Sequence, residues 1–341
     1  MEPENLGSNG PNSCNGSTSG LRVGNRSVVV EGKWLKVARI FDEIWVEGSA
    51  LEAPDSFVAC LKKTSFKPDL FTFAQALPET TPKFNYAVEW DNLAVAPTKD
   101  FKAWWEGLPQ ESRKNVRRAE RRGLVVKPVD FSDDLVCGIK EIYDETPIRQ
   151  GRRFPHYGKD IGTVRRENSS YLERSQFIAA YHKNELAGFL KMVYVGPTAR
   201  IMQILAKNSH FDKRPVNALL AKAMEICSHQ PVEHLIYGQY IYDKKADSPV
   251  TEFKRRNGFQ QLLLPRYYVA MTLKGRLALA LKLHRGLKAL LPGRMLSLLL
   301  RIRQSVYEQT VLRPKQGLAL EAVSDAKGRS GPVADPPLPE A

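Results

Sequence analysis

Apolar and polar positions alternate irregularly over residues 27–123 and far more regularly over residues 124–273. In the first region, short apolar runs favour strands, and two apolar segments favour helices. An amphipathic helix is predicted at Gln110–Arg122, because its apolar and small residues recur at helical spacing on one side. Gly123 follows it as a C-terminal stop. The sequence therefore predicts an N-terminal α/β region that ends in a polar helix.

The second region predicts strands and helices in a regular order. Lys183 and Asn184 join two strands in a pair typical of a hairpin turn. Pro215 can begin a helix, since the first helical position needs no N–H. The predicted elements are a strand at 124–129, a helix from Asp133 to about Tyr143, a polar loop from Asp144 to Tyr171, strands at 176–182, 185–195 and 199–206, a helix at 215–228, a strand at 234–238, a short helix opened by Ser248 and Pro249, and strands at 259–264 and 267–272.

The two ends of the chain have a different composition. Residues 1–26 are rich in Gly, Ser and Asn, and residues 311–341 are rich in Pro, Gly and small side chains. Such segments bury too little apolar surface to offset the entropy of ordering, so both are predicted to be disordered. Between the body and the tail, residues 274–310 are predicted to form basic amphipathic helices.

The net charge, the lack of an apolar leader and the spacing of cysteines and histidines limit the possible ligands and cellular locations of the protein. The chain of 341 residues carries a formal charge of +14, and the excess lies between about Lys102 and Arg303. A basic surface of this kind attracts nucleic acid, anionic membrane or a phosphate-bearing cofactor. The N-terminus has no apolar leader, and no run of about 18 apolar residues follows, so we expect a cytoplasmic protein. Four widely spaced cysteines and six histidines show no metal-binding pattern, and no metal is expected.

The segment Lys274–Arg303 has a second interpretation besides packing on the sheet. It contains basic residues and no acidic residue, and several of its leucines gather on one side of a helix. This pattern is typical of a helix that lies at a membrane surface. Weak, reversible contact with the anionic inner face of a membrane is therefore one expectation, and simple packing against the core is the alternative.

Two sequence segments carry a family resemblance. The order of elements over residues 124–273 resembles the GNAT fold of N-acyltransferases, and Phe253–Phe259 is similar to its late helix with a Gly-Phe ending. The segment Trp104–Ala119 resembles the Arg-Lys-Asn-x-Arg-(Lys/Arg)-Ala helix of bacterial Fem-type GNAT transferases, which add aminoacyl groups to cell-wall precursors. The resemblance implies an α+β fold with a GNAT-like mixed, mostly antiparallel sheet flanked by helices. Residues 27–123 would then be an α/β region that is a degenerate GNAT half.

The resemblance also implies where a donor binds. In a GNAT domain, two neighbouring strands separate at one end and hold the pantetheine arm of acetyl-CoA or another acyl-CoA. Here those strands are Ala199–Ala206 and His234–Gly238. The next turn, Asn208–Pro215, lacks the glycines that usually cradle the pyrophosphate, so side-chain charges are expected to replace them, with solvated charges as the alternative. The expected donor-binding residues are Ala206, Lys207, Asn208, Lys213, Arg214 and Lys254.

Lys254 stands where many family members carry a tyrosine as general acid. A protonated lysine can stabilise a leaving thiolate, and a solvated surface lysine is the other interpretation. The long loop after the first helix covers the acceptor site in the family. The acceptor-binding residues expected in it are Arg149, Gln150, Arg152 and Tyr157, and a merely solvated loop is the alternative.

The expected catalytic residues are Tyr240, Tyr242 and Gln203. Either phenol can orient an acceptor or relay a proton at the end of a strand, and simple packing is the alternative interpretation. Gln203 replaces a carboxylate, and an amide cannot act as a base. A water, His210 or a substrate group would then take the proton. The histidines at positions 156, 182, 210 and 234 are otherwise interpreted as structural or surface residues.

Two functions remain open. The first is an N-acetyltransferase-like enzyme that transfers an acyl group directly from acyl-CoA, or a related activated donor, to an amine or hydroxyl of a small-molecule or cell-envelope acceptor. The second is a catalytically inactive GNAT-like module that binds nucleic acid or another polyanion. The cations that would serve the second function are Arg113, Lys114, Arg117, Arg118, Arg121 and Arg122.

Overall fold

A computed structural model of the chain describes residues 19–23, 26–45, 51, 53–149, 152–242 and 248–285. Most of these residues belong to one compact unit, formed by Met1–Pro147 and Phe154–His284. The hairpin of β7 (Ile148–Arg149) and β8 (Arg152–Arg153) belongs to a second unit. Most of the predicted basic helical extension and the whole predicted tail lie outside the described residues.

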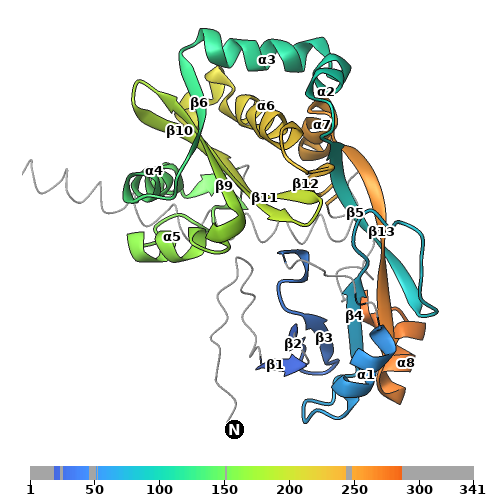
Figure 1. Cartoon of the computed structure of the whole chain (residues 1–341). Coiled ribbons are helices and arrows are strands. Elements are labelled where there is room, and N and C mark those ends of the chain that lie inside the picture. Colours follow the sequence, from blue (N-terminus) through green and yellow to red (C-terminus); the bar gives the residue numbers. More distant parts are fainter. Residues whose placement is uncertain are drawn as a thin grey trace, which may run out of the picture. The chain divides into compact units, whose positions relative to one another are not determined.

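One long mixed sheet forms the first unit (Figure 1). Most neighbouring strands run antiparallel, and two neighbouring pairs run parallel. The strands in spatial order are β1 (Ser19–Val23), β2 (Arg26–Glu31), β3 (Val37–Ile40), β4 (Leu70–Ala74), β13 (Gln260–Ala270), β5 (Ala87–Pro97), β12 (His234–Gln239), β11 (Thr198–Ala206), β10 (Glu185–Val195), β9 (Ser175–His182) and β6 (Leu124–Val129).

The sheet repeats one strand arrangement in two halves. In the first half, β1, β2 and β3 form an antiparallel meander, and β4 then pairs in parallel with β3. In the second half, β9, β10 and β11 form a meander, and β12 pairs in parallel with β11. Each half then takes its next strand from the other half: β13 pairs with β4, and β5 pairs with β12. The two exchanged strands also pair with each other.

Helices connect these strands and cover the sheet. The α-helices are α1 (Pro54–Lys62), α2 (Phe101–Gly107), α3 (Gln110–Arg121), α4 (Asp133–Asp144), α5 (Ile161–Asn168), α6 (Pro215–Ser228), α7 (Pro249–Arg256) and α8 (Leu273–Ala280). Short 3₁₀ turns are η1 (Glu43–Trp45), η2 (Leu172–Arg174), η3 (Asn208–Lys213) and η4 (Leu283–Arg285). Ser132, Asp160 and Ser248 cap helices by accepting a backbone N–H two or three residues into the first turn.

The two faces of the second half have separate cores. On one face, apolar residues of α6 such as Leu219 and Met224 pack with Ala199 and Ile201 of β11. On the other face, Ile139 of α4 and Val164 of α5 pack with other strand residues, including Phe177 and Phe189. A side chain on β11 therefore faces either α6 or the α4–α5 layer, and this decides which part of a site it can join.

The structure confirms the predicted α+β class with a mostly antiparallel sheet flanked by helices. Three local predictions differ. Helix α5 lies inside the predicted loop. Val164 and Asn168 are its only buried residues, so the sequence there has too weak an apolar period to predict a helix. β13 is one strand rather than two, because it pairs with β5 without a break from Gln260 to Tyr268. β4 pairs with it only from Arg266 onward, after Pro265, which has no N–H to donate. β1 lies within the segment predicted to be disordered and pairs with β2.

Within the described ranges, no helix is both long enough and apolar enough to cross a bilayer.

Candidate functional site

β11 and β12 separate after a short paired stretch. They pair only at Thr198, Ala199 and Arg200, whose partners are His234, Leu235 and Ile236. From Ile201 onward β11 continues to pair with β10, and β12 continues beside β5. The two parallel strands thus form a V that opens at their carboxyl ends, as the family resemblance implies for the donor strands.

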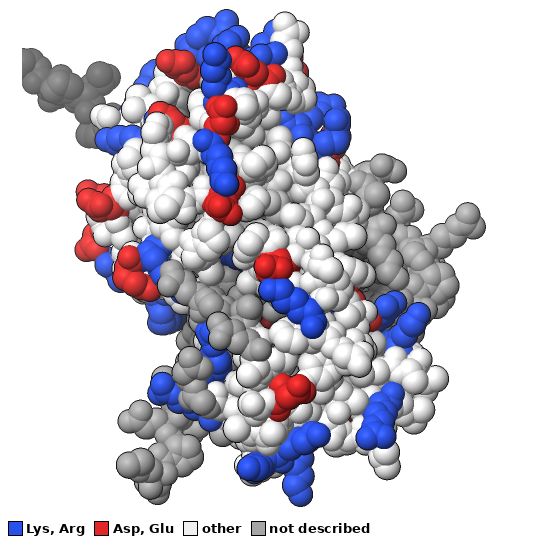
Figure 2. All heavy atoms as spheres, turned by 45° about the vertical axis from the view of Figure 1, so that its right-hand side comes forward, with Lys and Arg blue, Asp and Glu red and all other residues white. Residues whose placement is uncertain are grey.

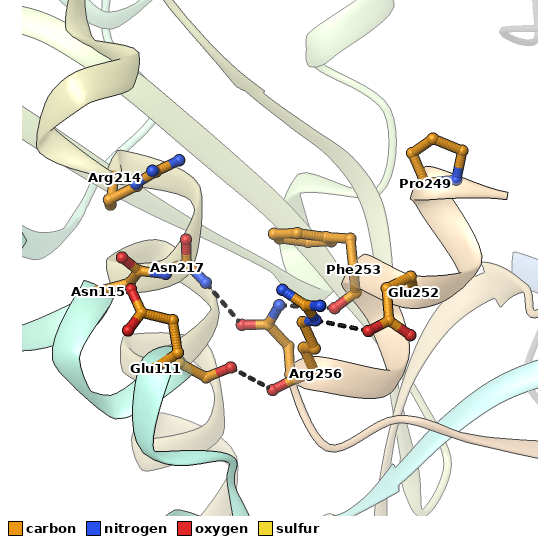
Figure 3. A pocket seen from close by; sticks show the side chains of 10 residues that line it. Glu111, Asn115, Arg214, Asn217, Pro249, Glu252, Phe253 and Arg256 are labelled. Atoms are coloured by element: carbon orange, nitrogen blue, oxygen red, sulfur yellow. Dashed lines mark hydrogen bonds and ion pairs between the residues drawn. The ribbon is translucent and has the colours of Figure 1, made fainter.

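A pocket of about 460 Å³ lies beside the start of α6 (Figure 3). Its walls come from α3, the first turn of α6, and α7. Arg214 and Asn217 line it from α6, and Arg256 faces them from α7. The other lining residues are Glu111, Ser112, Asn115, Pro249, Glu252, Phe253 and Asn257. The pocket therefore joins the predicted phosphate turn to the predicted late helix.

Arg214 is the expected donor residue that lines this pocket. Its backbone is left-handed, with φ +59°, and it precedes Pro215 at the start of α6. The side chain is exposed, and among the described residues it makes no hydrogen bond or ion pair. The neighbouring Lys213 contacts Asp212 at 3.3 Å. Arg214 thus combines an available cation with the positive end of a helix dipole.

Three other expected donor residues lie at the opposite side of the turn. Lys207 is buried, and its Nζ contacts Glu141 at 2.8 Å and Glu185 at 2.6 Å. The N–H groups of Asn208 and Ser209 donate to the carboxylate of Glu145, at 2.6 and 2.9 Å. A pocket of about 660 Å³ here is lined mainly by carboxylates. Ala206, also an expected donor residue, is buried at the end of β11.

Lys254 is buried rather than solvated, and only 1% of its surface is exposed. Its Nζ donates to the carbonyl of Tyr237 at 2.7 Å and to the carbonyl of Gln239. It also lies over the rings of Tyr237 and Tyr242, 4.5 and 4.7 Å from their centroids. Burial lowers the pKa of Lys254 to about 8. The lysine thus lies at the end of β12 that no longer pairs with β11, as a cation with a lowered pKa.

The two expected catalytic tyrosines follow the same strand end. The hydroxyl of Tyr242 is 3.3 Å from Nζ of Lys254, and burial raises the pKa of this tyrosine. Tyr240 is half-buried against the α6 core, and its N–H donates to the carbonyl of Asn92 on β5. Tyr242 therefore contacts Lys254 directly, whereas Tyr240 is tied to an exchanged strand.

Gln203 lies on the face of β11 that carries α4. Its Oε1 accepts from the hydroxyl of Tyr143 at 2.8 Å, and its Nε2 is 3.4 Å from Nε2 of His156. Burial raises the pKa of Tyr143 to about 12, so this phenol stays protonated.

His156 was interpreted from the sequence as a structural or surface residue, and the structure brings it to Gln203. Its Nδ1 lies 3.6 Å from a carboxylate oxygen of Glu167 and 3.2 Å from Nζ of Lys159. The ring packs 4.5 Å from that of Tyr143. Both oxygens of Glu167 also accept from Lys159, at 2.6 and 2.7 Å, so these side chains form one polar cluster with Gln203 around the ring of His156.

A buried lysine on β10 supports this cluster. Lys191 pairs in register with Gln203, and its Nζ donates to the carbonyls of Asn168 and Ser170 at 2.8 and 2.5 Å. These carbonyls end helix α5, which carries Glu167. Burial lowers the pKa of Lys191 to about 8. Lys191 thus fixes the C-terminal end of α5, and through it the position of Glu167 behind His156.

The four expected acceptor residues are only partly described. Tyr157 is exposed next to His156. Arg149 and Arg152 pair with each other in the small second sheet, and Gln150 lies outside the described residues. In the described part of the chain, no cluster of three or more His, Cys, Asp or Glu side chains is arranged to hold a metal ion.

The basic helix α3 presents its charge to solvent. Figure 2 shows Lys and Arg side chains gathered at the top of the molecule, where α3 lies in Figure 1. Lys114, Arg117, Arg121 and Arg122 are exposed. Arg122 pairs with Asp212 at 2.6 Å, and Arg117 lies over the ring of Trp105. Most of this cationic face is therefore available to an anionic partner.

Comparisons with known proteins match this chain by fold. No family model and no curated protein matches the sequence. The C-terminal domain of a protein described as a lysylphosphatidylglycerol synthetase from Agrobacterium fabrum is 14% identical, with a TM-score of 0.50 over 78% of this chain and 88% of that domain. FemX is 11% identical (TM-score 0.48, 79% and 88% covered), and L-PGS from Bacillus licheniformis is 13% identical (TM-score 0.49, 79% and 89% covered).

The meander of β9, β10 and β11 and the V between β11 and β12 agree with the fold that the sequence resemblance implied. The likeness to the Agrobacterium fabrum domain covers both halves. The chain therefore has a GNAT-like fold, in which one strand arrangement occurs twice.

Proposed function

We propose that this protein is an acyltransferase that moves an acyl group from acyl-CoA, or a related activated donor, directly to an amine or hydroxyl. The separation of β11 from β12 is the observation that carries the proposal. Parallel strands that part after three residue pairs leave backbone groups between them that an extended donor arm can bind as an added strand would. A backbone N–H there can polarise the acyl carbonyl without a covalent enzyme intermediate.

The donor is assigned to the α6 side of the V. Its phosphates would enter the pocket beside Arg214 and Arg256, where the α6 dipole adds a positive field. Lys254 would stabilise the leaving group, since a lysine with a pKa of about 8 is charged at neutral pH and can donate its proton. Lys207 serves a different purpose in this proposal, because two carboxylates already compensate its charge.

The acceptor is assigned to the α4–α5 side. Gln203 and Tyr143 would orient the nucleophile through hydrogen bonds. Both ring nitrogens of His156 already face donors, so a water or a substrate group would take the proton of the nucleophile. Bringing donor and acceptor together across one strand edge supplies orientation, which is the main source of catalysis in direct transfer.

Isothermal titration of the full chain with CoA, acetyl-CoA and longer acyl-CoA thioesters tests the donor assignment. Arg255 and Arg256 give a matched pair, because both bind Glu252 on α7 but only Arg256 lines the pocket. We expect Arg256→Gln to weaken donor binding about tenfold and Arg255→Gln to leave it unchanged. If no thioester binds, an aminoacyl-tRNA or carrier-protein donor must be titrated next. If none of these binds, the acyltransfer proposal fails.

The alternative is a module that binds a polyanion without catalysis. The exposed cations of α3 favour it, as do the turn amides that Glu145 already occupies. RNA and DNA binding measured at several salt concentrations would decide, with the double variant Arg117→Gln/Arg121→Gln as the probe. Tight binding that weakens steeply with salt and with this variant, without affinity for any activated donor, would support the alternative.

The acceptor proposed is a small molecule or a cell-envelope component. A helix that contacts the membrane would bring the enzyme to a cell-envelope acceptor. Leu273, Leu277 and Leu281 lie exposed along α8, and Lys274 is also partly exposed. Vesicle co-sedimentation tests this, comparing the full chain with a Leu277→Gln/Leu281→Gln variant. Binding to anionic but not neutral vesicles, reduced in the variant and released by salt, is expected. Equal sedimentation of both proteins excludes α8 as the contact.

A further inference from the structure

Arg200 stands at the apex of the V. It is the last residue of β11 that pairs with β12, opposite Ile236. Its neighbours Ala199 and Ile201 are buried in the core beneath α6. Because side chains alternate along a strand, Arg200 projects from the other face, the one on which Gln203 meets Tyr143. The guanidinium therefore lies on the acceptor side, at the point where the two strands part.

Nε of the Arg200 guanidinium is buried and makes no hydrogen bond, and within the described ranges the side chain forms no ion pair. Burial lowers the pKa of Arg200 to about 10, so the group remains charged at neutral pH. A partly buried guanidinium whose Nε lacks an acceptor is unfavourable for folding, since arginine offers five donors and can accept none.

The acidic groups nearby are already used. Glu43 is close enough to influence the pKa of Arg200, but its carboxylate accepts from the N–H of Ala74 at 2.7 Å and from Arg266 at 2.9 Å. Asp91 accepts from Nε of the same Arg266 at 2.8 Å. Arg266 therefore pairs with both carboxylates, and Nε of Arg200 is left without an acceptor.

We propose that Arg200 binds an oxyanion, a carboxylate or phosphate group carried by the acceptor. The planar fork of a guanidinium fits either group through two parallel hydrogen bonds. An acceptor held this way would place its nucleophile further along β11, beside Gln203 and His156. This inference rests on the proposed acyltransfer, because it concerns the acceptor of that reaction. It restricts the acceptor to molecules that carry a negative charge.

Thermal unfolding of the full chain in chloride buffer gives the first test. Arg200→Met removes an unpaired charge and keeps much of the side-chain volume, so we expect it to raise the unfolding temperature. Arg266→Met is the matched control, because it breaks the two ion pairs of a satisfied arginine and should lower that temperature. If Arg200→Met lowers it to a similar extent, Arg200 is structural and the proposal is overturned.

Anion titrations give the second test and separate the two sources of charge. Sodium phosphate and sodium acetate are added at constant ionic strength to an Arg214→Gln background, which removes the donor-pocket cation. We expect a saturable rise in unfolding temperature with one of the two anions. Adding Arg200→Met should weaken the apparent affinity at least tenfold, and Arg200→Lys should fall between. Identical curves with and without Arg200 overturn the proposal.

The donor titrations described above keep this inference distinct from the proposed function. Anion binding that depends on Arg200, without binding of any activated donor, leaves the site standing and removes acyltransfer. Donor binding without an effect of Arg200 on anions does the reverse.

Discussion

Lys254 on α7 donates to the carbonyl of Tyr237 on β12, 2.7 Å away, and so ties the late helix to the open end of the V. The ammonium is dehydrated, and two carbonyl groups and two aromatic rings surround it. This arrangement couples the charge of one side chain to the shape of the proposed donor site, and two pH effects follow from it.

The first pH effect concerns stability. The pKa of Lys254 is about 8 in the folded chain, against an ordinary value of 10.5. Between these values the unfolded state binds more protons, so the contribution of this residue to the free energy of unfolding rises with pH. Below about pH 8 both states are protonated, and the contribution is constant. In urea titrations, wild-type stability should therefore increase relative to Lys254→Met from pH 8 to pH 10. A difference that stays constant over this interval contradicts the burial of the charge.

The second pH effect concerns turnover with whichever donor binds. If protonated Lys254 assists the leaving group, the turnover number should fall as pH rises through about 8, where the proton is lost. Lys254→Arg keeps the charge at higher pH, so its remaining activity should lack this decline. Equal alkaline limbs in both proteins would remove Lys254 from the chemical step.

Gly258 links the two segments that carried the family resemblance. Its φ is +80°, and a Cβ at this position would lie 2.5 Å from Nε1 of Trp104. We expect Gly258→Ala to lower the free energy of unfolding by about 3 kcal/mol, from backbone strain plus overpacking. Gly158→Ala is the matched control, since φ is +75° there and no atom lies within 4 Å of the added Cβ. Denaturant unfolding should give only about 1 kcal/mol for the control. Equal losses would mean that Trp104 moves aside without cost.

Arg214 is expected to lower the free energy of unfolding and to strengthen donor binding. Its left-handed backbone is strained for a residue with a Cβ, so Arg214→Gly should raise the free energy of unfolding by up to about 1 kcal/mol. The same change should weaken binding of a phosphate-bearing donor at least fivefold. Lys183→Gly, which relieves a φ of +50° in the β9–β10 turn, should stabilise similarly and leave donor binding unchanged. A donor affinity equal in both variants would remove Arg214 from the site.

The exchanged strands predict that neither half folds alone. A chain cut between residues 123 and 124 separates β5 from β12 and β13 from β4. Each fragment expressed by itself should lack the dispersed amide spectrum of a folded protein, and co-expression should restore a soluble complex. A fragment 124–341 that folds on its own would show that the pairing with β5 is dispensable.

Local patterns predicted most elements because each depends on neighbouring residues. The β9–β10 hairpin and the start of α6 follow from Lys183-Asn184 and from Pro215, and both predictions are confirmed. The strand exchange was not predictable in this way. β5 and β13 have ordinary strand sequences, and nothing local in them states which of several strands each will join.

The residues of the candidate site were likewise predictable only where the signal was local. Gln203 stands out in the sequence because it interrupts an apolar strand, and it does lie in a polar cluster. His156 reaches it from 47 residues away, through a turn whose course depends on α5, and no spacing rule connects the two. The unpaired state of Arg200 depends on Arg266 having taken both nearby carboxylates, which only the folded chain reveals.

The position of β13 also determines when the first half can be completed during synthesis. Strands β1 to β4 leave the ribosome early, but the strand that borders β4 ends at Ala270. Until then the edge of β4, with its buried Phe71 and Phe73, has no neighbour to cover it. A growing chain of about 200 residues therefore carries an open apolar strand edge, the kind of surface that aggregates or recruits a chaperone. Translation speed over the second half should thus influence the yield of folded protein more than codon choice before residue 100.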